Sequence, residues 1–96
     1  RIPFKTADLN LNFADSYEAE CFQAIMAAEI IEHLENPRHL LRQLFTLLQP
    51  GGRLILSTPN PSSTASKLRF LMGNRFQWFS DANYLGDGHI TPVTPW

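Results

Sequence analysis

The chain has 96 residues, enough for one small domain or part of a larger one, and carries 8 basic and 9 acidic side chains for a formal net charge of −1. These charges are scattered and form no basic stripe, so neither a nucleic acid nor an anionic membrane surface is an expected partner. No apolar stretch approaches the roughly 20 residues that span a bilayer, so we expect no membrane span.

The first half of the chain predicts two strands. Residues 2–7 are a short apolar and polar mixture that we interpret as a strand followed by a loop, and residues 10–20 as a connection with a helical turn. Residues 21–28 form an almost continuous apolar run. Because Ala and Met favour helix, a helix is an alternative there, but we favour a strand buried on both faces, as parallel sheets require.

A helix and a further strand follow. Asn36 can cap a helix and Pro37 suits its first position, while leucines and a phenylalanine repeat at helical spacing from Leu40 to Leu48. Pro50-Gly51-Gly52 ends this helix, and residues 53–58 read as a strand stopped by Pro59-Asn60-Pro61. The order strand, helix, strand predicts a right-handed βαβ unit with parallel strands.

The pattern changes after residue 61. Apolar residues between Ala65 and Met72 predict a short amphipathic helix, and residues 73–96 show little periodicity. An irregular segment of this length usually covers a site or packs against another part of the protein. The lone cysteine, Cys21, has apolar neighbours, so we expect a buried thiol in a reducing compartment, and hence a cytoplasmic protein.

Three polar clusters follow the ends of the expected strands: residues 8–10, 29–33 and 58–60. Ligands of open parallel sheets bind beyond the carboxyl ends of the strands. This placement predicts an α/β protein with a binding site made by these clusters.

Four motifs occur in the same order as in a known family. They are A-D-L at 7–9, E-I-I-E-H-L-E-N-P at 29–37, L-Q-P-G-G-R-L at 48–54 and S-T-P-N at 57–60. This series resembles class I S-adenosylmethionine-dependent methyltransferases, and among them the small-molecule enzymes that include the ubiquinone-biosynthesis O-methyltransferases. The segment G-H-I-T-P at 88–92 is also similar to one found downstream in that family.

The resemblance implies a Rossmann-like α/β fold with a mostly parallel sheet and flanking helices, of which residues 1–96 would form a partial domain. Residues 1–60 would hold the sheet and helix core, and residues 61–96 a helix and an irregular substrate-side segment. The family's glycine-rich loop and ribose-binding acid have no counterpart here. We expect both upstream of Arg1, and we therefore expect this chain to be inactive on its own.

The implied reaction is methyl transfer from S-adenosylmethionine to an O, N or C nucleophile, with a small molecule as the acceptor. By resemblance, the Asp8 carboxylate would accept a hydrogen bond from the adenine amino group, and the Leu9 amide would meet the ring. The alternative is that Asp8 is a solvated turn residue, because Asp is common in turns.

Glu29, Glu32 and His33 form the most distinctive local group. If Glu29 opens a helical turn, their spacing places all three within one arc of the helix. Two carboxylates and an imidazole can bind a divalent cation such as Mg²⁺, and some relatives, including small-RNA 3′-end methyltransferases, use such a set with a later histidine, here His89. The alternative is a metal-free pocket in which Glu29 and His33 are catalytic, with a carboxylate orienting His33 as general base, and Glu32 is structural or exposed.

Other interpretations stay open at this point. The aromatic residues Trp78, Phe79, Tyr84 and Trp96 could cover an apolar acceptor or belong to the core. A non-catalytic domain that serves in interaction or structure is a different class of function, and a small-RNA methyltransferase is a third reading that the near-neutral charge disfavours.

Overall fold

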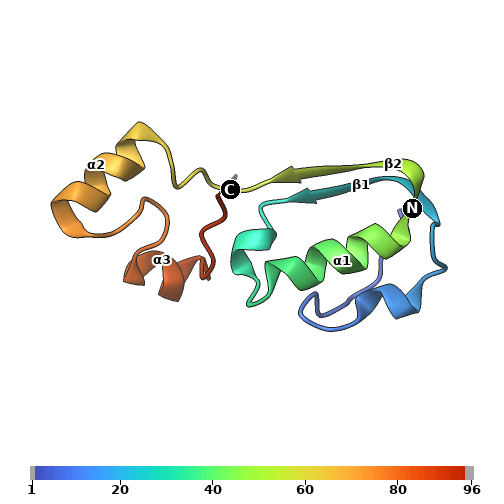
Figure 1. Cartoon of the computed structure of the whole chain (residues 1–96). Helices are drawn as coiled ribbons and strands as arrows, with labels where there is room; N and C mark the ends of the chain where they lie inside the picture. The colour runs from blue at the N-terminus through green and yellow to red at the C-terminus, as the bar shows by residue number, and fades with distance from the viewer. Residues whose placement is uncertain (1, 95–96) are drawn as a thin grey trace.

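The computed structural model describes residues 2–94. Its two strands and the helix between them form a βαβ unit (Figure 1). Strand β1 (Phe22–Ala28) and strand β2 (Leu48–Ser57) are parallel, with Ala24 opposite Arg53 and Ala28 opposite Ser57. Helix α1 (Pro37–Leu47) connects them. The predicted strand, helix, strand order and the parallel pairing are confirmed, and the α/β fold fits part of a Rossmann-like domain.

Helix α1 begins where the sequence predicts. The Asn36 side chain accepts a hydrogen bond from the His39 amide at 3.0 Å, and Pro37 occupies the first helical turn. Leu40, Leu44 and Leu47 are buried in the core, with Leu40 only 1% exposed. Phe45 lies outside this apolar face and is 80% exposed, so the predicted stripe is narrower than the sequence suggested.

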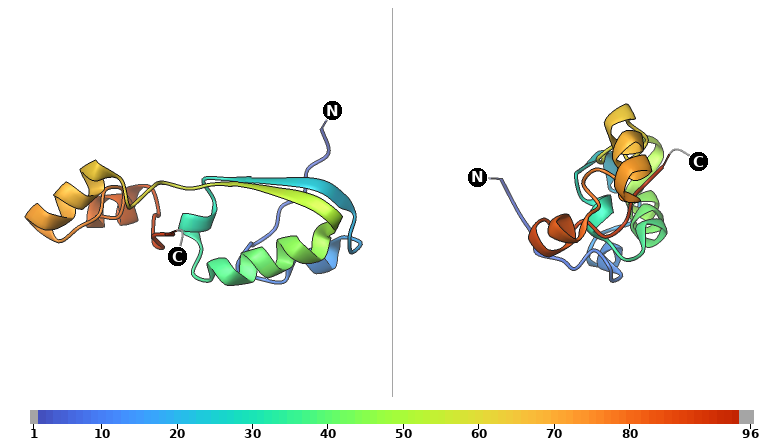
Figure 2. Two further views of the ribbon diagram at one scale, coloured as in Figure 1. Left: turned by 45° about the horizontal axis from the view of Figure 1, so that its top comes forward. Right: turned by 90° about the vertical axis from the view of Figure 1, so that its left-hand side faces the viewer.

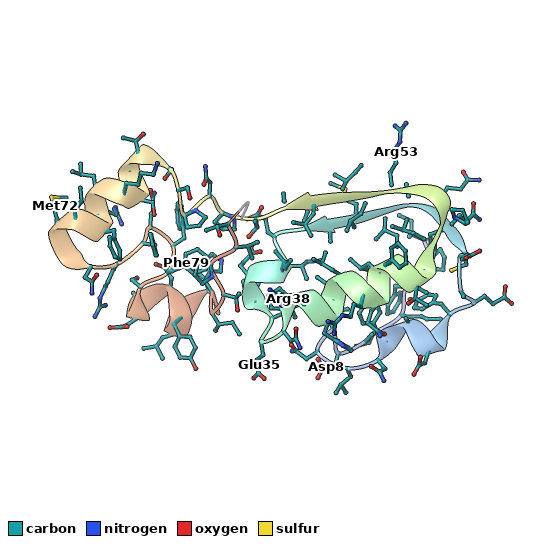
Figure 3. All side chains as sticks on the ribbon, viewed as in Figure 1. Asp8, Glu35, Arg38, Arg53, Met72 and Phe79 are labelled. Atoms are coloured by element: carbon teal, nitrogen blue, oxygen red, sulfur yellow. The ribbon has the colours of Figure 1, made fainter. Side chains whose placement is uncertain are left out.

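The sheet is covered on one face only among the described residues. Ala27 on β1 is buried on the side of α1, whereas Met26 is 71% exposed and Ile55 on β2 is 57% exposed. Figure 3 shows Arg53 of β2 pointing away from α1. The prediction that residues 21–28 are buried on both faces is therefore wrong for the described structure, because α1 supplies only one of the two layers that a parallel sheet needs.

The segment before β1 is a loop fastened to α1. The 3₁₀ turn η1 (Phe13–Ser16) packs on this helix, and the Ala14 amide donates to Gln43 Oε1 at 3.0 Å. Residues 2–7 pair with no strand in the described structure, so the strand predicted there is wrong; a strand needs a hydrogen-bonded partner that local composition does not reveal. Cys21 is exposed, which corrects the expected buried thiol.

The C-terminal third extends the molecule beyond the carboxyl ends of the strands (Figures 1 and 2). It holds helix α2 (Thr64–Gly73), close to the predicted helix, and helix α3 (Asp81–Gly86), which the prediction of an irregular tail missed. The chain then returns to the sheet, and the molecule measures 48 × 27 × 26 Å. Within residues 2–94, every helix is too short or too polar to cross a bilayer.

Candidate functional site

The candidate site begins at the carboxyl end of β1. Glu29 adopts a left-handed conformation (φ 52°), and its amide donates to the Ser57 carbonyl at 3.0 Å. A 3₁₀ turn, η2 (Ile31–His33), follows. Glu29 therefore precedes the turn instead of opening it. Its exposed carboxylate accepts a hydrogen bond from the Ser57 hydroxyl at 2.7 Å.

Glu32 is fully buried, which rules out the exposed charge that was one of the alternatives for it. The Thr58 hydroxyl donates to Glu32 Oε2 at 3.0 Å. Among the described residues, Glu32 Oε1 has no hydrogen-bond partner, and His33 Nε2 is 3.9 Å from it. A buried carboxylate oxygen without a partner costs free energy, so this atom marks a place where a ligand would be stabilising.

Residues 88–91, here named the tail strap, cross the turn and bring a second histidine to Glu32. The amides of Ile90 and Thr91 both donate to the Glu32 carbonyl at 2.9 Å. The Thr91 hydroxyl donates to the Leu34 carbonyl at 2.8 Å. These bonds join segments more than 50 residues apart in the sequence and place His89 beside His33, with ring centroids 4.9 Å apart.

Backbone carbonyls fix the orientation of both imidazoles. His33 Nδ1–H donates to the Gly88 carbonyl at 3.1 Å, and His89 Nδ1–H donates to the Trp78 carbonyl at 2.9 Å. A carbonyl oxygen can only accept, so in the neutral rings the Nε2 atoms carry the lone pairs. Metal-binding histidines commonly use their second ring nitrogen in this way.

Glu32, His33 and His89 are thus brought together by the fold, and we name them the Glu32 cluster. One ligand atom from each residue lies within 4.8 Å of the others. A carboxylate and two imidazoles form a donor set that suits a divalent transition metal, with coordination positions left for other groups. The unpaired Glu32 oxygen fits such an ion. Glu29, which the sequence also placed in the metal group, lies outside the cluster.

The loop of Asp8 and Leu9 lies beside the same turn. Asp8 is exposed, and one of its carboxylate oxygens accepts from the Asn10 amide at 2.9 Å, an Asx turn. The Glu35 amide donates to Asn10 Oδ1 at 3.2 Å, which ties this loop to the segment after η2. Ala7 and Leu9 line a largely apolar cavity of about 430 Å³. Asp8 itself does not line this cavity, and the adenine contacts of Asp8 and Leu9 stay a prediction.

The aromatic residues expected to cover an acceptor lie in different places in the structure. The Phe79 ring lies 5.7 Å from the His89 ring, so it borders the cluster. Tyr84 is 60% exposed on α3. Trp78 contributes its carbonyl to His89 and is itself about half exposed. Trp96 lies outside the described residues.

Two hydroxyl residues of the site, Thr58 and Thr91, have no role that the sequence alone predicts. Thr58 belongs to the polar cluster after β2, and Thr91 belongs to the G-H-I-T-P segment, but neither position predicts a partner. A hydroxyl directly after a parallel strand, aligned with acidic residues after the neighbouring strand, was the available signal. The partners themselves depend on the fold of the tail strap.

Comparisons with known proteins identify the family of the chain. Residues 3–95 match the model of a family described as a methyltransferase domain. No solved structure matches the chain significantly.

Several ubiquinone biosynthesis O-methyltransferases are similar to parts of the chain. The rat mitochondrial ubiquinone biosynthesis O-methyltransferase is 30% identical over 73 residues, covering 76% of this chain and 19% of the rat protein. The mouse protein of that name is 32% identical over 68 residues, covering 71% and 18%. The protein from Xanthomonas axonopodis pv. citri is 39% identical over 51 residues, covering 53% and 21%. The chain matches about a fifth of the length of these relatives.

Proposed function

The chain belongs to the methyltransferase-domain family, and from this membership we propose that the protein containing it transfers a methyl group from S-adenosylmethionine to an oxygen of a small molecule, with a divalent cation held by the Glu32 cluster. The family implies the methyl donor. The small acceptor is supported by the relatives, which are named as O-methyltransferases of ubiquinone biosynthesis.

One observation carries the proposal of a cation. Glu32 Oε1 is buried and has no hydrogen-bond partner within residues 2–94. It lies 3.9 Å from His33 Nε2, and the other ring nitrogen of His33 donates to a backbone carbonyl. A purely structural carboxylate would normally be satisfied on both oxygens. The two imidazoles favour ions such as Mn²⁺ over Mg²⁺, which prefers oxygen ligands.

The residues of the chain divide the remaining tasks. Asp8 and Leu9 would hold the adenine, and Glu32, His33 and His89 would hold the cation. The exposed Glu29 carboxylate, positioned by Ser57 at the carboxyl end of the sheet, would accept the proton of the acceptor hydroxyl. A divalent cation supplies Lewis acidity that makes a hydroxyl easier to deprotonate. Phe79 beside His89 offers an apolar wall to the acceptor.

The sulfonium donor already carries the activation for transfer. The protein therefore contributes mainly alignment of the nucleophile with the methyl group and removal of a proton. This division of labour predicts that loss of the cluster slows transfer more than it weakens binding of the methyl donor.

The experiment is a methyl-transfer assay of the full-length protein with labelled S-adenosylmethionine and a panel of small hydroxylated aromatic acceptors. We expect product with at least one acceptor, loss of turnover after chelation, and recovery with Mn²⁺. Turnover that persists after exhaustive chelation would exclude a role for the cation and leave His33 as the general base. Absence of transfer to every class of acceptor would favour the non-catalytic alternative.

A further inference from the structure

Thr58 stands apart from the residues that would touch the cation or the substrate. It is the first residue after β2, and its half-buried side chain points to the turn that follows the neighbouring strand β1. The pairing of Ala28 with Ser57 brings these two strand ends level with each other. Thr58 therefore reaches Glu32 through the register of the sheet, from 26 residues away in the sequence.

The hydrogen bond from Thr58 selects one oxygen of the Glu32 carboxylate. The hydroxyl donates to Oε2 at 3.0 Å, while Oε1 lies 3.9 Å from His33 Nε2. A carboxylate with free rotation would present either oxygen, or neither, to the two imidazoles. With one oxygen held by a neutral donor, the other is fixed toward His33 and keeps its lone pairs for a ligand.

We propose that Thr58 is a positioning residue of the metal centre, which orients the Glu32 carboxylate and thereby sets the affinity of the Glu32 cluster for a divalent cation. This inference rests on the proposed function. The role parallels that of the Gly88 and Trp78 carbonyls, which orient His33 and His89. Each cluster residue then has one neutral partner that leaves its ligand atom free.

A neighbouring pair offers a matched comparison. Ser57 also donates its hydroxyl to a carboxylate, that of Glu29, at 2.7 Å. Both hydroxyls come from adjacent residues at the end of β2, and both acceptors follow β1. Only the Thr58 partner is buried and belongs to the cluster.

The test is a titration of the full-length protein with Mn²⁺, in which electron paramagnetic resonance measures the free ion without any need for turnover. Thr58→Val keeps the shape of the side chain but removes the donor, and it should weaken Mn²⁺ binding by about 10-fold or more, the usual effect of losing such a partner. Thr58→Ser keeps the donor and should bind close to the wild type. Ser57→Ala should also bind close to the wild type.

Circular dichroism checks that each variant is folded, and Thr58→Ala replaces Thr58→Val if the valine variant is not. Wild-type affinity in the folded Thr58→Val or Thr58→Ala protein would overturn the role of Thr58 while leaving the metal centre intact. Equal weakening by Thr58→Ser or Ser57→Ala would also overturn it, because the effect would then not depend on this hydroxyl. If the wild-type protein binds no Mn²⁺, the proposed metal centre fails, and the inference fails with it.

Discussion

Replacing Glu32 by Gln should raise the stability of the metal-free protein while abolishing its response to metal. The Gln amide oxygen can take the place of Oε2 and accept the Thr58 hydroxyl. The amide NH₂ then takes the place of Oε1, so a donor faces the lone pair of His33 Nε2 where an unpaired acceptor lies now.

The expected change in the free energy of unfolding follows from Glu32 Oε1, which has no hydrogen-bond partner within residues 2–94. A buried polar atom without a partner costs about 1–3 kcal/mol, so its removal should increase the free energy of unfolding by about 1 kcal/mol or more. With metal present, the wild type should instead be the more stable of the two proteins. At a free Mn²⁺ concentration 100 times the dissociation constant, the wild type should gain about 2.7 kcal/mol and the variant nothing.

The assay is urea unfolding of the full-length protein, followed by circular dichroism, in chelator and in Mn²⁺. The exposed Glu29 provides the control: Glu29→Gln should change the free energy of unfolding by no more than about 0.5 kcal/mol in either buffer. Refutation would be a Glu32→Gln protein that is less stable than wild type in chelator. Equal stabilisation of both proteins by Mn²⁺ would refute the reasoning as well.

Three further substitutions, the last with a matched control, test the cofactor loop, the cap of α1 and the core. Asp8→Ala in the full-length protein should weaken S-adenosylmethionine binding by about 1–2 kcal/mol, measured by calorimetry, because it removes the carboxylate that we propose accepts from adenine. Unchanged affinity would make Asp8 only a turn residue. Asn36→Ala should lower the free energy of unfolding by about 1 kcal/mol through loss of the α1 cap, and denaturant melts check this. Leu40→Ala should lower it by about 2–5 kcal/mol because the side chain is 1% exposed, whereas Leu41→Ala, at 40% exposed, should cost clearly less; similar costs would contradict the assigned face of α1.

Local sequence signals predicted the elements that depend on local chemistry. The cap at Asn36, the proline at the start of α1 and the leucine spacing located that helix, and the apolar run before Glu29 located β1. The order of these elements then predicted parallel strands, which the structure confirms. Their polar ends predicted where the candidate site lies.

Features that depend on contacts between distant segments could not be predicted from local sequence signals. The burial of Glu32 and its bond to Thr58 follow from the register of the two strands. The approach of His89 was expected only from resemblance, and its geometry depends on backbone bonds from the tail strap to the Glu32 carbonyl. Glu29 was misplaced because helical spacing was assumed for a residue that adopts a left-handed conformation before the turn.

Binding of S-adenosylmethionine to the full-length protein, measured by isothermal titration calorimetry, tests the central claim most directly. We predict saturable binding with one molecule of the cofactor per chain, and competition by S-adenosylhomocysteine, which has the same adenine and ribose. Absence of binding by either compound to the folded protein would contradict the assignment of methyl transfer.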